Sequence, residues 1–160
     1  MKIAEDRMGN GGEFTSRAKT MYWLGYWPYY RPLRKRLGLL KVKHAISGAA
    51  PIAPDVLAFF LGLGVPLYEA YGMTENSAVT TSNFHGRMKV GTVGEAHAFT
   101  EVMLAEGSNE ILTRSLGNFV GYWDKPEATD EVLGEDGWLR TGDVGEWVDG
   151  THLRVVDRIK

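Results

Sequence analysis

The pattern of apolar and polar positions predicts a strand, a helix and a second strand in the first half of the chain. Residues 41–47 alternate as a half-buried strand does. Proline and an acid open a helix over 54–61, and its nearly continuous apolar residues predict burial on all sides. Residues 64–68 form the next β-favouring run. This order is a βαβ unit, which predicts two parallel strands.

From Lys89 onward the pattern changes to short alternating runs between glycines and polar turns. It predicts strands at 90–95, 100–105, 110–114, 146–148 and 152–156, a helical turn at 127–132, and a hairpin turn at Asp149–Gly150. The fold class is therefore α/β, with a βαβ parallel-sheet part followed by a small antiparallel β-barrel-like part. We expect the two parts to cover residues 1–88 and 89–160.

The segment before the first predicted strand is glycine-interrupted over residues 3–19, where we expect loose chain with a short helix at 14–19. Residues 21–30 then hold six aromatics, and basic residues follow them. One interpretation is an anchor at a membrane surface, and the other is a helix that packs its aromatics against a neighbouring helix or sheet. Pro28, Pro32 and the near-neutral net charge favour packing.

Composition narrows the class of protein. The 160 residues suit one globular domain with a moderate core, and the net charge of −2 gives no case for binding nucleic acid. The absence of cysteine excludes disulfides and thiolate sites, and fits a reducing compartment. The charged first residues are unlike a signal peptide, and no apolar run approaches the roughly 18 residues of a membrane span. We expect a cytoplasmic protein, with peripheral membrane contact left open.

The residues at 71–75, after the second predicted strand, are the best candidate for chemistry. Tyr71 offers a face to a flat ring, and Gly72 allows a close backbone approach. Thr74 can donate to a phosphate oxygen, while Glu75 is a hard oxygen ligand for Mg²⁺. A plain turn with a packed tyrosine and a solvated glutamate explains the same residues. In a βαβ unit, the turn at 48–51 opens at the same sheet edge, so we expect the two segments to share a ligand.

Several segments resemble, in order, the motifs of the AMP-forming adenylate synthetases, a superfamily of acyl-CoA synthetases, luciferases and peptide-synthetase adenylation domains. They are Ser47–Pro51, Tyr71–Glu75, Gly91–Gly94, Gly121–Trp123 with Pro126–Thr129, Gly137–Asp143 and Asp157–Lys160. The wording of the first two is most similar to long-chain, bubblegum-type fatty acyl-CoA ligases. The resemblance implies that ATP, a fatty acid and CoA are the substrates and that Mg²⁺ is the metal. Fatty acid and ATP would give acyl-adenylate, from which the CoA thiol displaces AMP.

The resemblance also implies a role for each matching residue. Residues Gly48, Ala49, Ala50 and Pro51 would lie along the adenine, with Ala70 and Tyr71 beside it. Gly72 and Met73 would line the acyl pocket. Thr74 and Glu75 would be catalytic, the first on the α-phosphate and the second on Mg²⁺. Asp143 would accept from the ribose hydroxyls, Arg158 would add a ribose or phosphate contact, and Lys160 would be the hinge.

Two parts of the family pattern have no match in this sequence: the glycine-rich loop that cradles the outer phosphates, and the small domain with the catalytic lysine. We therefore expect the chain to be a piece of a larger enzyme, cut at the hinge, that holds the adenine, ribose and Mg²⁺ half of the site. The remainder of the enzyme would be its partner. The alternative is a non-catalytic nucleotide-binding remnant or a module of a split enzyme, so the activity of the isolated chain is left open.

Overall fold

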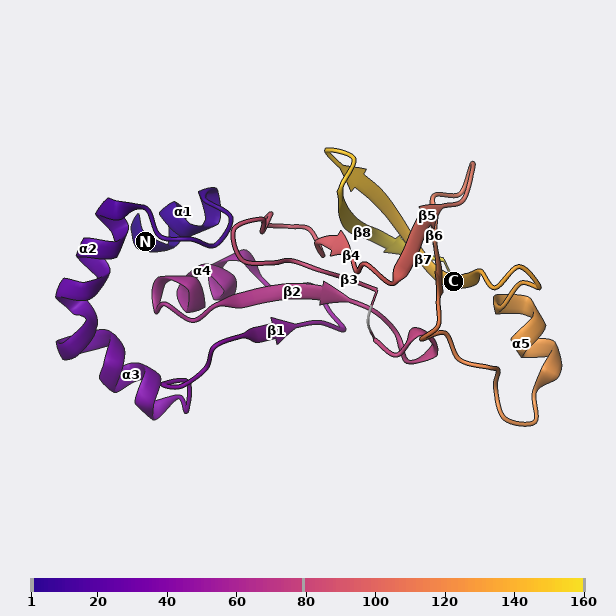
Figure 1. Cartoon of the computed structure of the whole chain (residues 1–160), viewed down its shortest axis with the longest axis horizontal. Coiled ribbons are helices and arrows are strands. Elements are labelled where there is room, and N and C mark those ends of the chain that lie inside the picture. Colours follow the sequence, from indigo (N-terminus) through magenta and orange to yellow (C-terminus); the bar gives the residue numbers. More distant parts are fainter. Residues whose placement is uncertain (1, 79, 160) are drawn as a thin grey trace. The chain divides into compact units, whose positions relative to one another are not determined.

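The computed structural model describes residues 2–78 and 80–159 (Figure 1). It divides into two compact units. One comprises residues 1–69 and 83–91, and the other comprises residues 70–82 and 92–160. The predicted division at residues 88 and 89 remains a prediction about subdomains. The boundary at residues 69 and 70 falls within a strand.

The first unit contains the predicted βαβ arrangement. Its strands are β1 (Ala45–Ser47) and the start of β2 (Leu67–Tyr71). They are parallel, with Ala45 opposite Leu67 and Ser47 opposite Glu69. Helix α4 (Pro54–Gly62) connects them, with its proline in the first turn as predicted. The parallel pair is therefore confirmed, although both strands are shifted or shortened relative to the predicted ranges.

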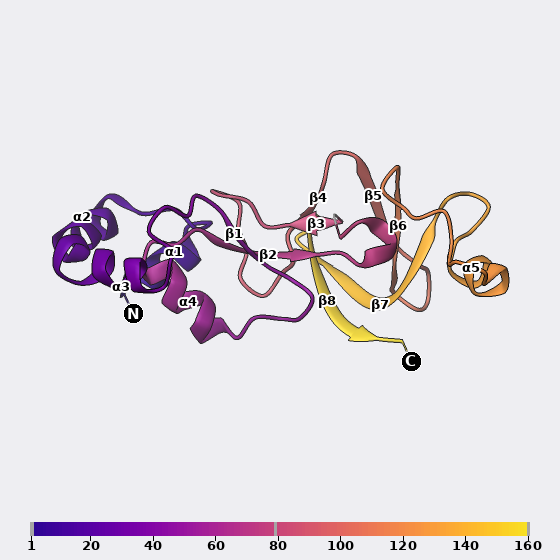
Figure 2. The ribbon, with the colours of Figure 1, turned by 90° about the horizontal axis from the view of Figure 1, so that it is seen from below.

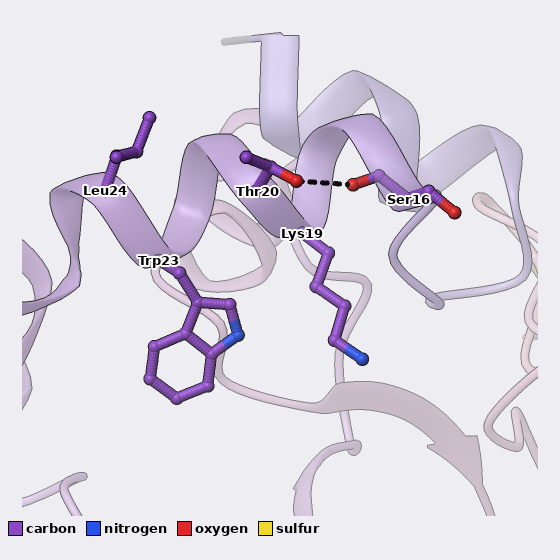
Figure 3. A pocket seen from close by; sticks show the side chains of 5 residues that line it. All are labelled: Ser16, Lys19, Thr20, Trp23 and Leu24. Carbon is purple, nitrogen blue, oxygen red and sulfur yellow. Dashed lines mark hydrogen bonds between the residues drawn. The ribbon is translucent and has the colours of Figure 1, made fainter.

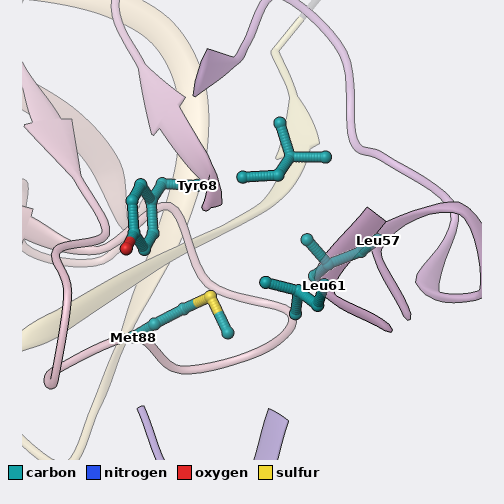
Figure 4. Close-up of a cluster of buried hydrophobic side chains, with 5 residues drawn as sticks. Leu57, Leu61, Tyr68 and Met88 are labelled. Atoms are coloured by element: carbon teal, nitrogen blue, oxygen red, sulfur yellow. The ribbon is translucent and has the colours of Figure 1, made fainter. Parts of the chain in front are cut away.

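The core of the first unit lies between α4 and β2. It consists of Leu57, Leu61, Leu67, Tyr68 and Met88, four of which are labelled in Figure 4. Leucines four residues apart lie on one face of a helix, so α4 has a single buried face. Phe60 is half-buried against this core, whereas Val56 and Phe59 are exposed. The prediction that this helix is buried on all sides is wrong.

The chain before residue 10 is more ordered than predicted. Residues Lys2–Gly9 form helix α1, where loose chain was expected. Arg7 on this helix is buried and donates from Nη1 to the carbonyl of Leu61 at 2.8 Å and from Nε to that of Gly12 at 2.7 Å. Burial lowers the pKa of its guanidinium. The arginine thus joins α1 to the end of α4, a long-range contact that local sequence does not reveal.

The aromatic segment forms three consecutive helical elements: α2 (Ser16–Gly25), the π-helical turn η1 (Tyr26–Tyr30) and α3 (Arg31–Arg36). Of its six aromatics, all within the described residues, only Tyr22 is buried, stacked on Tyr30 at 5.0 Å. Trp23 and Trp27 are 54% and 68% exposed. The predicted packing against a neighbouring helix or sheet is therefore right for Tyr22 and wrong for the tryptophans.

An open hollow of about 510 Å³ lies along α2. Figure 3 shows the side chains of Lys19 and Trp23 extending on the same side of this helix.

Among the residues that the structure describes, no helix has both the length and the apolar character that crossing a bilayer requires.

The second unit is built on antiparallel strands. The end of β2 pairs with β3 (Thr81–Ser82), which pairs with β4 (Glu95–Ala96). A second sheet has the order β5 (Thr100–Leu104), β6 (Glu110–Ser115), β7 (Leu139–Val148) and β8 (His152–Arg158). In Figure 2 the paired strands β7 and β8 curve along their length. The remaining elements are the 3₁₀ turn η2 (Thr74–Asn76) and helix α5 (Pro126–Val132).

Most of the predicted β elements of this unit are confirmed. The hairpin turns at Asp149 and Gly150, both with positive φ, and sets Val148 opposite His152. The run at 90–95 is strand only at its end, in β4. Ile111, Leu139 and Leu153 are fully buried in this unit.

The three tryptophans of this unit lie outside its fully buried core. Trp123 is 95% exposed. Trp138 is half-buried, and Arg114 lies over its ring at 4.7 Å. Trp147 is also half-buried, on β7.

Candidate functional site

Three predicted site residues of the second unit meet at Asp143. This residue lies on β7 directly opposite Arg158 on β8. The Tyr71 hydroxyl, from the end of β2, donates to Asp143 Oδ2 at 2.7 Å. The Arg158 Nε lies 3.6 Å from Asp143 Oδ1, so both carboxylate oxygens face a donor. The Asp143 side chain is only 16% exposed, whereas that of Arg158 is mostly in solvent.

The environment keeps Tyr71 a hydrogen-bond donor. Burial raises the pKa of the Tyr71 phenol well above its ordinary value. A hydrogen bond with Thr141 opposes part of this rise, and the bond to Asp143 adds to it. Thr141 also accepts from the backbone N–H of Asp143 at 3.2 Å, through its Oγ1. The hydrogen bond from its hydroxyl to Asp143 therefore holds the Tyr71 ring in place. No local sequence pattern indicates this bond.

The loop after Tyr71 is held by a residue that sequence reasoning missed. Asn76 is buried, and its Oδ1 accepts from the backbone N–H of Met73 at 2.8 Å. Its Nδ2 lies 3.4 Å from the hydroxyl of Thr113 on β6. The carbonyl of Met73 also accepts from the N–H of Ala78 at 2.8 Å. An asparagine one residue after the Thr-Glu pair was the available signal, because this side chain commonly bonds to nearby backbone in turns.

The side chain of Glu75 has a hydrogen-bond partner that the sequence does not indicate. The hydroxyl of Tyr122 donates to Glu75 Oε1 at 2.7 Å, across 47 residues of sequence. This bond raises the pKa of Tyr122, with a smaller contribution from burial. The backbone carbonyl of Glu75 accepts from the N–H of Phe119 at 2.7 Å. Tyr122 lies in the predicted Gly121–Trp123 motif, but nothing in that motif indicates a contact with Glu75.

The remaining predicted residues of the loop take different environments. Thr74 opens η2 and has an exposed side chain, open to a ligand. Met73 and Gly72 are half-buried. Ala70 is half-buried on β2, where it pairs with Ser82. Lys160, the predicted hinge, lies outside the described residues.

The predicted adenine turn belongs to the first unit. Residues Gly48, Ala49, Ala50 and Pro51 follow β1 directly and are all exposed, and Ala49 has a φ of 67°. Glu69, opposite Ser47 on β2, is half-buried. Burial raises the pKa of its carboxyl, and a backbone hydrogen bond from Ile52 opposes the rise. Sharing of one ligand by this turn and the Tyr71 loop remains a prediction.

The donor chemistry near Glu75 suits a cation that arrives with a ligand. Within residues 2–78 and 80–159, no group of three or more His, Cys, Asp and Glu side chains is placed to enclose a metal ion. Magnesium is commonly held by one or two carboxylates together with the phosphates of a substrate. Glu75, half-buried and held from one side by Tyr122, fits that mode of binding and does not fit a closed structural metal site.

Residues 13–123 match the family described as AMP-binding enzyme. The chain belongs to this family. It is 43% identical over 128 residues to fadD11 of Mycobacterium tuberculosis. These residues make up 80% of this chain and 22% of fadD11. It is 36% identical over 135 residues to the long-chain-fatty-acid–CoA ligase ACSBG2 of Xenopus laevis, covering 82% and 18%.

A solved structure supports the fold of this family member. The fatty acyl CoA synthetase of Mycobacterium tuberculosis is similar with a TM-score of 0.68 and 27% identity, over 80% of this chain and 27% of that one. The predicted fold class and the predicted resemblance to long-chain fatty acyl-CoA ligases are thus confirmed. The chain spans about a fifth of the length of the curated relatives it matches.

Proposed function

We propose that this member of the AMP-binding enzyme family supplies the adenosine side of the active site of a long-chain fatty acid–CoA ligase. The supporting observation is the cluster in which Tyr71 and Arg158 both face the carboxylate of Asp143. A carboxylate has about four lone-pair positions, so Asp143 can still accept from ribose hydroxyls while it keeps these two partners. The two partners hold the carboxylate in place before the nucleotide arrives.

The family resemblance supplies the roles proposed for the other residues. Thr74 donates to the α-phosphate from its exposed side chain. Glu75 is the protein ligand of Mg²⁺, which when bound neutralises charge on the phosphate oxygens. Gly48–Pro51 lie along the adenine, and Gly72 and Met73 border the acyl group. Fatty acid and ATP form acyl-adenylate and pyrophosphate, and the CoA thiol then displaces AMP.

The test is binding of AMP to the isolated chain, measured by calorimetry. Asp143→Ala should weaken AMP binding by about tenfold or more, since hydrogen bonds to a charged group are worth roughly 1.5–3 kcal/mol. Asp130→Ala is the matched control, because Asp130 is an exposed acid on α5. Binding that is equal in wild type and Asp143→Ala, or undetectable in both, would remove nucleotide binding by this chain. AMP binding without thioester formation from fatty acid, ATP and CoA would favour a nucleotide-binding module.

A second candidate function, attachment to an anionic membrane surface, has its own supporting observation. Eight of the 18 Lys and Arg residues lie between Phe14 and Pro54, and none of the 20 Asp and Glu residues does. This basic segment, residues 14–54, also carries the exposed side chains of Trp23, Leu24 and Trp27. Aromatic and basic side chains together are typical of segments that lie in the headgroup region. A lipid substrate gives such contact a purpose.

A further inference from the structure

The hydroxyl of Tyr122, a residue outside the strands, bonds to the carboxylate of Glu75. It donates to Glu75 Oε1 at 2.7 Å, and the Tyr122 ring is partly exposed. The ring packs edge-on against Phe119, with centroids 4.8 Å apart. Packing against Phe119 requires only the ring, so it does not explain the hydroxyl bond to Glu75, the predicted metal ligand.

Tyr122 is in turn held by helix α5. Its backbone N–H donates to the hydroxyl of Thr129 at 2.9 Å, and that hydroxyl donates to the carbonyl of Lys125 at 3.0 Å. Gly121 has a φ of 143°, and a Cβ there would lie 2.9 Å from Thr129 Cγ2. Only glycine allows this approach. Gly121 and Thr129 together therefore fix the direction of the Tyr122 side chain.

The same segment also fixes the backbone around Glu75. The N–H of Phe119 donates to the carbonyl of Glu75 at 2.7 Å, and Ser77 Oγ donates to the carbonyl of Gly117 at 2.8 Å. Residues 117–122 thus contact the loop at the backbone and the side chain of Glu75 and at the side chain of Ser77. This segment lies 47 residues from Glu75 in sequence at its far end.

We propose that Tyr122 is a positioning residue for Glu75, holding its carboxylate in the orientation that receives the metal–nucleotide complex. The proposal rests on the proposed function, in which Glu75 is the Mg²⁺ ligand. A free glutamate side chain loses up to about 2 kcal/mol of rotamer entropy when it is fixed, and a side chain already held avoids most of that cost. The tyrosine bond engages one carboxylate oxygen, so the second remains for a cation.

The experiment compares ATP affinity with Mg²⁺ and with EDTA. For wild type we expect tighter binding with Mg²⁺. In Tyr122→Phe the ratio of the two affinities should fall by about tenfold, the lower end of losses seen when partners of metal ligands are removed, with EDTA affinity unchanged. Thr129→Val should give a smaller fall, and Thr129→Ser should restore the ratio. Tyr29→Phe, at an exposed tyrosine of η1, is the matched control.

Each other outcome decides against the proposal in a distinct way. Equal losses with and without Mg²⁺ in Tyr122→Phe would mean that the hydroxyl supports the fold and has no special relation to Glu75. An unchanged ratio in Tyr122→Phe would mean that Glu75 needs no positioning. If wild type binds AMP in an Asp143-dependent way but ATP without any Mg²⁺ effect, the metal role of Glu75 and its positioning are overturned, while adenosine binding through Asp143 stands. If wild type binds no nucleotide, the proposed function and the positioning are both overturned.

Discussion

At the scale of single residues, Gly72 is required by the protein's own backbone, independently of any ligand. A Cβ on this residue would lie 2.3 Å from the carbonyl carbon of Ala78 and 2.6 Å from its Cα. Both atoms belong to backbone that is itself bonded to Met73. The sequence explains this glycine by the close approach of a ligand. In the structure, the backbone of Ala78 leaves no room for a Cβ on residue 72.

Gly72→Ala should therefore lower the stability of the second unit and disturb the loop. Crowding of this kind costs about 1–3 kcal/mol, which urea unfolding monitored by circular dichroism would detect as an earlier midpoint. Gly9→Ala is the control, since nothing lies within 4 Å of a Cβ there and the residue ends a helix. It should be neutral or slightly stabilising. Equal midpoints for Gly72→Ala and wild type would mean that the Ala78 backbone moves aside at no cost.

Motifs name the residues of the candidate site, but they do not indicate how those residues pair. Tyr71, Asp143 and Arg158 all came from motifs read along the chain. The bond between Tyr71 and Asp143 joins residues 72 apart, so no local pattern predicts it. The same holds for Asn76 and Thr113, which are 37 apart. Motifs report which groups a site needs, while the hydrogen bonds that orient those groups depend on how distant strands meet.

At the scale of elements, Asp143 owes its place to an irregularity between β6 and β7. The register shifts between Glu110 and Leu112. The buried Glu110 side chain accepts from the backbone N–H of Gly142 at 3.1 Å and from Arg140 Nη2 at 2.7 Å. A side chain thus satisfies a backbone donor that the shifted ladder leaves open. Gly142, with a φ of 71°, directly precedes Asp143.

Glu110→Ala should destabilise this sheet by about 2–3 kcal/mol, because it leaves the Gly142 N–H unpaired and removes a charged hydrogen bond. Arg140→Ala is the matched control for the ion pair alone. Glu110 keeps its bond from Gly142 in that variant, so the loss of Arg140 should cost less than that of Glu110, about 1–2 kcal/mol. Glu110→Gln keeps an acceptor for Gly142 and should fall between the two. Urea midpoints measure all three, and equal effects of Glu110→Ala and Arg140→Ala would show that the bond to Gly142 contributes nothing.

The elements that sequence reasoning found are those with a strong local signal. The hairpin at Asp149–Gly150 and the β-type runs of β5 and β6 depend on neighbouring residues, and they are confirmed. Helix α1 was missed because its stability comes from the buried Arg7 and its bonds to distant carbonyls. In α4 the composition was nearly all apolar, which hid the fact that only one face meets the core.

At the scale of the whole molecule, charge is separated along the sequence more strongly than the net value of −2 indicates. The basic segment, residues 14–54, carries no acid, so the acids all lie outside it. By itself, the near-neutral net charge disfavours a membrane surface. Attraction to anionic headgroups acts within about 10 Å, so the local charge is the relevant quantity. The exposed tryptophans of the same segment add an apolar contribution.

The chain should therefore bind vesicles that contain phosphatidylserine more tightly than vesicles of phosphatidylcholine alone, and added salt should weaken that binding. Replacing Trp23 and Trp27 together by serine should reduce binding by about tenfold, since each buries part of an indole in the headgroup region. Trp123→Ser is the matched control, because Trp123 is at least as exposed but lies outside the basic segment. Co-sedimentation measures all of these.

Two results would decide against the membrane surface, and they have different physical meanings. If Trp123→Ser reduces binding as much as the double variant does, any exposed tryptophan attaches to lipid and the basic segment has no special role. If wild type fails to bind the anionic vesicles, the cations of residues 14–54 are directed at something other than lipid headgroups. In either case nucleotide binding through Asp143 is unaffected, because Tyr71, Asp143 and Arg158 all lie in the other compact unit.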